Sequence, residues 1–175
     1  EIKKLQRKMG VTSIFVTHDQ VEAMTLADRL AVINNGILEQ LGTPIEIYNN
    51  PQSVFVAGFI GSPQMNFIDA ELKNNILITD SFTIPNFLSD FNGDVIIGIR
   101  PEHLSPSNKG EINITVDLLE QLGSDNIIYG EINGGKEFCY RSPGNIVVNL
   151  GDKLTLTIVE NKFYVFDKNN GKILN

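Results

Sequence analysis

The sequence predicts an α+β protein, with an α/β segment that ends near residue 65 and an all-β segment after it. Helical and strand-like patterns alternate over residues 1–65. Over residues 66–175, short β-type runs recur at roughly 8–12-residue spacing, which is typical of a sandwich or barrel. The turn-forming sequence Gly61-Ser62-Pro63 separates the two textures. With 42% hydrophobic residues, the chain can bury a substantial core.

The first two elements are an amphipathic helix and a strand. Residues 1–9 place Ile2 and Leu5 on one apolar face, and Gly10 is a typical residue to end such a helix. No capping residue begins it, so we expect the helix to be the end of a longer one. Val11–Thr17 is apolar and β-branched, which predicts a strand.

A helix over Gln20–Ala27 and a hairpin are expected next. Asn35-Gly36 is a strong two-residue turn signal, so Arg29–Asn34 and Ile37–Leu41 are predicted to pair antiparallel. Two short helices follow. Thr43 to Glu46 forms a capping box with Pro44 at the first helical position, which predicts a helix to about Tyr48. Asn50-Pro51 is expected to open a helix that ends at Phe59.

The remaining residues predict strands joined by turns, with one helical turn over Pro85–Phe91. The expected strands are Ile68–Lys73, Ile76–Thr79, Val95–Arg100, Glu111–Leu119, Ile127–Ile132, Phe138–Arg141, Lys153–Val159 and Phe163–Phe166.

Charge and cysteine content exclude several functions. The net charge is −7, from 14 basic and 21 acidic residues, and residues 66–175 hold 9 of the former and 15 of the latter. Such an acidic segment is poorly suited to bind a phosphate backbone, which disfavours a nucleic-acid partner. The single cysteine, Cys139, excludes an intrachain disulfide and fits a reducing compartment. We expect it to be a sheet residue rather than a nucleophile.

His18 is the main candidate for chemistry. The apolar run Ile14-Phe15-Val16 stops at Thr17-His18-Asp19, and a helix pattern follows at once. This places an imidazole after a strand, where open α/β sheets bind their ligands. Asp19 is expected to cap the helix, and Glu22 lies within it, so neither is favoured as a general base. From the residues alone, a hydrogen-bonded structural histidine remains an alternative.

Gly130 to Glu137 nearly matches the phosphate-binding loop G-x-x-x-x-G-K-[ST]. Glu137 replaces the hydroxyl that would hold Mg²⁺, and the pattern is strand, Asn-Gly-Gly turn, strand. Without a helix N-terminus to bind an anion, we interpret it as a hairpin.

The sequence around His18 closely resembles the switch-histidine region of ABC-transporter ATPases of the bacterial sugar-importer (maltose/multiple-sugar) type. The resemblance covers Val16 to Ala23 and continues through Ala27-Asp28-Arg29, Asn35-Gly36, Gly42-Thr43-Pro44 and residues 61–67. It implies that His18 contacts the γ-phosphate of ATP and helps to place the attacking water. His18 is thus both the expected catalytic and the expected cofactor-binding residue, and no metal ligand is expected.

Two later segments resemble the regulatory portion of the same family, which is an OB-like barrel of the TOBE class. They are Gly98–Leu104 and Leu122–Gly130. The resemblance implies that residues 1–65 are the tail of a P-loop α/β nucleotide-binding domain and that 66–175 are an OB-like (TOBE) domain. Arg100 and Glu102 could bind a partner or fix the turn at Pro101, and His103 is expected on the surface or in packing.

By resemblance, the chain is the C-terminal part of the ATP-hydrolysing subunit of a carbohydrate importer. The Walker A, signature, glutamine-loop and Walker B sequences are missing. We therefore expect ATP and Mg²⁺ in the intact protein, and neither cofactor nor ATP hydrolysis in this chain. The implied partners are a second ATPase subunit, membrane permease subunits and regulatory proteins. The resemblance also implies that the protein lies on the cytoplasmic face of the membrane.

Two alternatives for the function stay open. The chain could be a regulatory and dimerisation module, or part of an importer of polyamines, sulfate, iron or glycerol phosphate.

The missing sheet neighbours of Val11–Thr17 lead to one structural expectation. An unpaired strand exposes backbone and apolar side chains. We expect a second copy, a rearrangement of residues 1–60 or the barrel to cover this edge.

Overall fold

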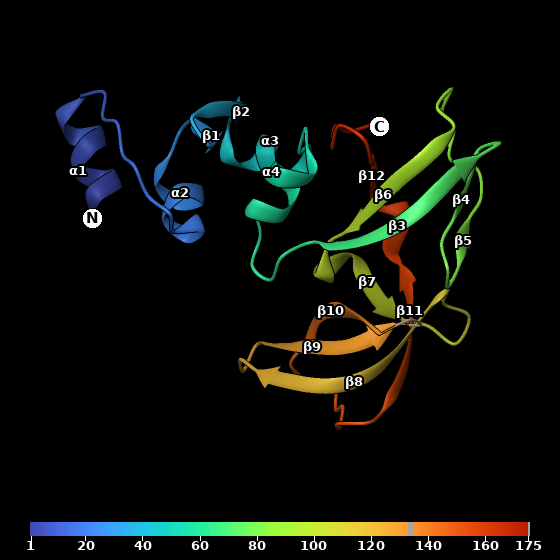
Figure 1. The fold of residues 1–175 in the computed structure, drawn as a ribbon. Helices are drawn as coiled ribbons and strands as arrows, with labels where there is room; N and C mark the ends of the chain where they lie inside the picture. Colours follow the sequence, from blue (N-terminus) through green and yellow to red (C-terminus); the bar gives the residue numbers. More distant parts are fainter. Residues whose placement is uncertain (133–134, 175) are drawn as a thin grey trace.

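The computed structural model describes residues 1–132 and 135–174, and the fold is mostly β with a few short helices (Figure 1). The elements of the first 60 residues are α1 (Ile2–Met9), α2 (Gln20–Leu26), β1 (Leu30–Asn34), β2 (Ile37–Gly42), α3 (Pro44–Asn49) and α4 (Val54–Phe59).

Local sequence signals set the ends of these elements. Gly10 ends α1 with a φ of 64°, the left-handed conformation that glycine adopts without strain. Asn35 and Gly36 both have positive φ, and β1 and β2 pair antiparallel, so the predicted hairpin is confirmed. The capping box of α3 is also present. The helix α4 begins three residues later than Pro51, because Ser53 caps it by accepting a hydrogen bond from the Val56 amide.

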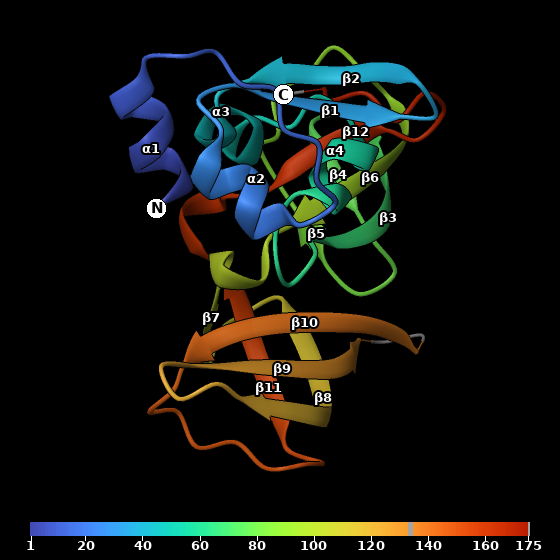
Figure 2. The same cartoon turned by 90° about the vertical axis from the view of Figure 1, so that its left-hand side faces the viewer.

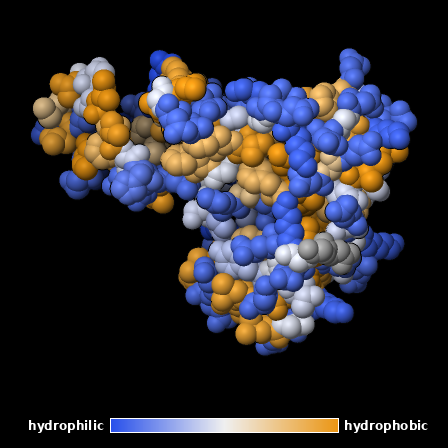
Figure 3. Space-filling model, viewed as in Figure 1, coloured by the Kyte–Doolittle hydropathy of each residue, from blue (hydrophilic) through white to orange (hydrophobic). Residues whose placement is uncertain are grey.

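The prediction of a strand over Val11–Thr17 is wrong. A strand requires a partner, and among residues 1–132 and 135–174 none pairs with this segment. The side chains of Ile14 and Val16 are 93% and 90% exposed, so neither the first 60 residues nor the barrel covers them. Figure 3 shows further apolar side chains over α1, at the far left of the molecule. The α/β sheet expected over residues 1–65 is thus reduced to the β1–β2 hairpin.

Residues 66–167 form two five-stranded antiparallel sheets, together called the barrel below. The upper sheet of Figures 1 and 2 has the order β12-β6-β3-β4-β5, and the lower sheet has the order β10-β9-β8-β11-β7. The strands are β3 (Asn66–Lys73), β4 (Ile76–Ile78), β5 (Thr83–Ile84), β6 (Gly93–Ile99), β7 (Leu104–Pro106), β8 (Ile112–Gln121), β9 (Asp125–Ile132), β10 (Lys136–Pro143), β11 (Lys153–Ile158) and β12 (Tyr164–Asp167).

One hydrophobic core joins the two sheets. Alternate residues of the strands point inward, as Ile112, Ile114 and Val116 do along β8. They pack in the same cluster as Ile97 of β6 and Val165 of β12, which belong to the other sheet. Burying both inner faces against each other stabilises the barrel.

The eight strands expected after residue 66 are all present, with ends that shift by up to two residues. The sequence missed β5 and β7, which are only 2 and 3 residues long. The helical turn expected over Pro85–Phe91 is absent. Asn86 takes a φ of 63°, which ends any right-handed helix there, and Phe87 is buried in the core instead.

The C-terminal residues return to the helices. Ser53 and Lys172 form an antiparallel bridge, and the Val54 amide donates to the Gly171 carbonyl at 2.9 Å. Ala57 of α4 packs with Phe166 of β12. The helix α4 is therefore fixed to the upper sheet. No helix of residues 1–132 and 135–174 is long and apolar enough to cross a membrane.

Asn66 connects the two sheets through its side chain. It lies on β3, and its amide nitrogen donates to the carbonyls of Ile99 and Cys139 while its oxygen accepts from the Cys139 amide at 2.7 Å. Cys139 lies on β10, the edge strand of the lower sheet. At Cys139, the Asn66 side chain thus makes the two backbone hydrogen bonds that a neighbouring strand would otherwise make with this edge.

We predict that Asn66→Ala lowers the free energy of unfolding by about 2–4 kcal/mol, because it leaves the buried amide and carbonyl of Cys139 without partners. Urea denaturation followed by circular dichroism measures the change. The control is Asn113→Ala, which removes an exposed hydrogen bond to Thr155 and should cost less than about 0.5 kcal/mol. Equal losses in the two variants would contradict the role given to Asn66.

Candidate functional site

The turn that precedes α2 holds His18. Asp19 is the N-cap of α2, and its carboxylate accepts hydrogen bonds from the amides of Val21 at 2.7 Å and Glu22 at 3.1 Å. The expected capping role of Asp19 is therefore confirmed. The Thr17 hydroxyl donates to the Glu22 carboxylate at 2.7 Å and accepts from the Asp19 amide. Both neighbours of His18 are thus fixed by local hydrogen bonds.

The His18 side chain itself is exposed. Asp19 caps the helix and Thr17 bonds to Asp19 and Glu22, while the imidazole between them stays exposed. The turn can therefore present an imidazole, whose ring nitrogens can form hydrogen bonds, to a group that approaches from solvent. The role of His18 toward a nucleotide stays a prediction.

Gln20, the first residue of α2, joins this turn to the segment that leads into β3. Its side-chain oxygen accepts a hydrogen bond of 2.7 Å from the Gly61 amide. Further along α2, Met24 packs against the small core of Val32, Ile47, Val56 and Ile60. The helix is thus held at its first residue and at its middle.

The helical segment meets the barrel at a junction formed by Gln20, Tyr48, the Ile60–Gly61 peptide and Arg100. Arg100 is the largest fully buried side chain there, with 1% of its surface exposed. Its Nη1 donates to the Ile60 carbonyl at 2.9 Å, and its Nη2 donates to the Tyr48 carbonyl at 2.6 Å. The guanidinium carbon lies 3.7 Å from the centre of the Tyr48 ring, a stacking geometry that favours a cation. Arg100 therefore fixes the junction internally, and is not free to bind a partner.

Tyr48 and Glu102 complete the cluster around Arg100. The Tyr48 hydroxyl donates to the Glu102 carboxylate, which lies in the short helical turn η1 (Pro101–His103). Burial, followed by this hydrogen bond, raises the pKa of Tyr48 to about 12. The phenol therefore remains a donor at neutral pH. His103 is half-buried, with an unpaired Nδ1, and burial lowers the pKa of its imidazole.

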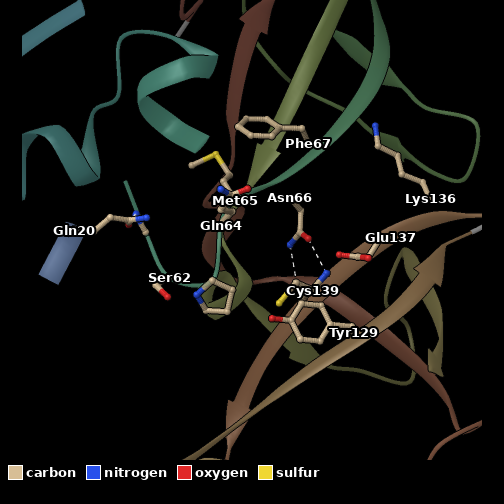
Figure 4. Close-up of a pocket in the computed structure, with 12 residues that line it drawn as sticks. Gln20, Ser62, Gln64, Met65, Asn66, Phe67, Tyr129, Lys136, Glu137 and Cys139 are labelled. Carbon is tan, nitrogen blue, oxygen red and sulfur yellow. Dashed lines mark hydrogen bonds between the residues drawn. The ribbon is translucent and has the colours of Figure 1, made fainter. Parts of the chain in front are cut away.

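A cavity of about 610 Å³ opens beside the junction, between residues 61–67 and the β9–β10 pair (Figure 4). Gln20, Ser62 and Gln64 lie on one side of it, and Tyr129, Glu137 and Cys139 lie on the other. Its polar side chains come from both segments, but no metal set is among them. In residues 1–132 and 135–174, no group of three or more His, Cys, Asp or Glu side chains is placed to hold a metal ion.

The β9–β10 pair contains both the near match to a phosphate loop and Cys139. Gly130 and Lys136 lie on the paired strands β9 and β10, so the near match to a phosphate loop is a hairpin. Residues 133 and 134 of that motif lie outside the described residues. Cys139 is a buried strand residue, and burial raises the pKa of its thiol to about 12, as expected for a structural cysteine.

Sequence reasoning did not find the contacts of Tyr48 and Gly61 at the junction, or the contact of Asn66 between the two sheets. These bonds join residues 33 to 73 positions apart, and no periodic sequence pattern predicts such contacts. The available signal was local. An arginine inside an apolar strand end, Ile97-Gly98-Ile99-Arg100, requires buried acceptors.

Comparison with known proteins gives two matching family models. Residues 61–104 match the MalK OB fold domain, and residues 97–166 match the TOBE domain. Among curated proteins, the sn-glycerol-3-phosphate import ATP-binding protein of Ruegeria sp. is 45% identical over 173 residues, which is 98% of this chain and 49% of the relative. The trehalose/maltose import ATP-binding protein of Thermococcus litoralis is 40% identical over 192 residues, 99% of this chain and 51% of the relative.

The chain therefore spans about half the length of the curated relatives it matches. A solved structure of the cytoplasmic molybdate-binding protein ModG covers 57% of the chain, with a TM-score of 0.48 and 9% identity. A likeness this weak carries no conclusion about the fold or the ligand.

We predict that the Cys139 thiol does not react with Ellman's reagent at pH 8 in the folded chain, because its pKa near 12 leaves almost no thiolate and the side chain is buried. Absorbance at 412 nm should reach one equivalent only after unfolding in guanidinium chloride. Rapid reaction of the native protein would contradict the prediction and show that the reagent reaches the thiol, through the cavity that Cys139 lines or by opening of β10.

We predict that His103 makes the fold less stable as the pH falls from 7 to 5. Its folded-state pKa lies below the ordinary value of 6.5, so the unfolded chain takes up the proton first and protonation favours unfolding. The contribution is full above pH 6.5 and declines as the pH falls toward the folded-state pKa. Thermal unfolding of His103→Gln should show a shallower fall in Tm over this range than the unchanged chain. Identical slopes would contradict the prediction.

Proposed function

We propose that this chain, a homologue of import ATP-binding proteins that carries the MalK OB fold and TOBE domains, is the C-terminal part of the ATP-hydrolysing subunit of an ABC importer. In this proposal, residues 1–65 are the tail of a nucleotide-binding P-loop domain and 66–175 are a regulatory TOBE domain. The family models, which match from residue 61 onward, support the boundary. The intact protein would bind ATP and Mg²⁺ with residues outside this chain.

The exposed imidazole of His18 carries the proposal. Thr17, Asp19 and Gln20 are all engaged in hydrogen bonds that fix the turn, while the histidine between them faces solvent. Such an arrangement suits a side chain whose partner arrives from outside. In the intact protein we assign His18 to the γ-phosphate of ATP, where an imidazole can donate to a phosphate oxygen and help to orient water.

For the transported substrate, we propose the class that includes sugars and glycerol phosphate. The similar proteins are named for sn-glycerol-3-phosphate import and for trehalose/maltose import. The proposed partners are membrane permease subunits and a second ATPase subunit, which would place the protein on the cytoplasmic face of the membrane.

A second proposed function is regulation and dimerisation by the barrel. It is favoured by the hydrophobic core of the barrel, which is separate from the first 60 residues. The cluster that joins the two sheets consists of buried residues between Ile68 and Val165, so the barrel core draws none of its buried side chains from the first 60 residues. This second role is compatible with the first, because one protein can contain both.

A chimera tests the proposed ATPase role. The P-loop portion of the Ruegeria sp. relative would be joined to this chain at its first residue, and ATP hydrolysis would be measured by phosphate release. We predict an active chimera, and a loss of roughly a hundredfold or more in kcat for His18→Ala, because the γ-phosphate loses its positioned partner. The control is Asn113→Ala, an exposed substitution in the lower sheet of the barrel, which should leave kcat unchanged. An inactive chimera, or an active His18→Ala variant, would contradict the proposal.

For the chain alone, we predict no ATP binding tighter than roughly millimolar, because the phosphate loop and the Mg²⁺ ligand that supply most of the binding are absent from its sequence. Isothermal calorimetry with Mg·ATP measures this. Micromolar affinity would show that the chain has a nucleotide site of its own.

A further inference from the structure

A single peptide group lies between the barrel and the turn that holds His18. It is the group joining Ile60 to Gly61. Its carbonyl, on Ile60, accepts from Arg100 Nη1 at 2.9 Å, and its amide, on Gly61, donates to Gln20 Oε1 at 2.7 Å. In a trans peptide these two bonds point in opposite directions. The peptide therefore connects Arg100, at the end of β6, with Gln20, at the start of α2.

On the barrel side, burial and several contacts hold Arg100 in place. Arg100 is fully buried, its second nitrogen donates to the Tyr48 carbonyl, and its plane stacks on the Tyr48 ring. A buried guanidinium keeps such contacts because losing an acceptor would leave a charge in an apolar surrounding. The position of the Ile60 carbonyl therefore follows the position of Arg100.

The peptide requires glycine at position 61. Its φ is 128°, a conformation that L side chains rarely adopt, and a Cβ there would lie 2.7 Å from Arg100 Nη1. Glycine permits both the backbone conformation and the close approach of the guanidinium.

The other end of the connection is two residues from His18. Gln20 is the first residue of α2, and Asp19, between the two, caps the same helix. The Thr17 hydroxyl binds both the Asp19 amide and the Glu22 carboxylate. Because these bonds make Thr17 to Glu22 one hydrogen-bonded turn, a displacement of Gln20 moves the backbone that carries His18.

We propose that the Ile60–Gly61 peptide couples the barrel to His18, with Gln20 as the positioning residue that sets the place of the imidazole. The proposal rests on the ATPase role given to His18 above. The cationic Arg100 polarises the peptide, which strengthens the hydrogen bond that its amide donates to Gln20. A change at the Arg100 cluster is thereby transmitted to the His18 turn through one backbone group.

The first test measures the contact in the 175-residue chain without nucleotide. Hydrogen exchange of the Gly61 amide, followed by NMR, should be about fivefold or more faster in Gln20→Met, which keeps the side-chain length and loses the acceptor. Gln20→Glu keeps an oxygen acceptor and should exchange like the unchanged chain. Equal exchange in Gln20→Met and the unchanged chain would overturn the contact, whatever the ATPase result.

The Arg100 side has its own variants in the same measurement. Arg100→Lys keeps the charge but cannot donate to two carbonyls while stacking on Tyr48, so Gly61 exchange should also rise. Tyr48→Phe keeps the ring and its backbone carbonyl and should leave Gly61 exchange unchanged. If Arg100→Lys does not fold, exchange in the Gln20 variants still decides whether the contact exists. Unchanged exchange in a folded Arg100→Lys would overturn the link to the barrel.

The second test separates positioning from a merely structural role. In the chimera, Gln20→Met should lower kcat about fivefold with an unchanged KM for ATP, because the loss of one hydrogen bond misplaces the imidazole without removing it. Gln20→Glu should restore kcat. If both variants are equally slow, or both equal the unchanged chimera, the positioning role is overturned. An inactive unchanged chimera would instead overturn the proposed function.

Discussion

The arrangement of this chain depends on one buried cation. Arg100 directly follows β6, and its guanidinium donates to two backbone carbonyls, of Tyr48 and Ile60, that belong to the helical segment. An unpaired guanidinium in this apolar place would be costly, so the barrel and the helices that cover it are stable only in a geometry that supplies these acceptors. The guanidinium also stacks on the Tyr48 ring, whose hydroxyl donates to the Glu102 carboxylate. The junction is thus specified by polar groups, while the hydrophobic core specifies the barrel.

A second polar contact, between the Asn66 side chain and the Cys139 backbone, fixes the two sheets relative to each other, as Arg100 fixes the helices relative to the barrel. Apolar contacts have little directionality, so the hydrophobic core alone sets the relative position of the two sheets less precisely than hydrogen bonds do. Asn66 adds that precision, because its side-chain amide must meet both the backbone amide and the carbonyl of Cys139. Asn66 lies on β3, which follows directly from the segment holding Gly61. One stretch of chain therefore carries both the contact that fixes the sheets and the contact that fixes α2.

Much of the fold could be predicted because its signals are local. The hairpin at Asn35-Gly36, the capping box at Thr43 and the strands of the barrel follow from turn chemistry and alternation within a few residues. Val11–Thr17 was predicted wrongly for the same reason. Its β-branched composition favours a strand, but the described residues provide no partner for it. The prediction of a helical turn over Pro85–Phe91 was wrong because Asn86 adopts a left-handed conformation, which the amino-acid composition of the segment does not reveal.

The site shows the same division between local and distant information. His18 and the capping role of Asp19 could be found from their immediate neighbours, and the nucleotide role of His18 remains a prediction. The positioning role proposed for Gln20 could not be found in this way, because it depends on a hydrogen bond from the Gly61 amide, 41 residues away in the sequence. A residue that couples the His18 turn to the rest of the molecule must contact a residue outside that turn, because contacts within the turn cannot transmit a change from elsewhere. Gln20 meets that condition, because its oxygen is bonded to a peptide whose other end is held by the barrel. Thr17 and Asp19 serve the turn alone.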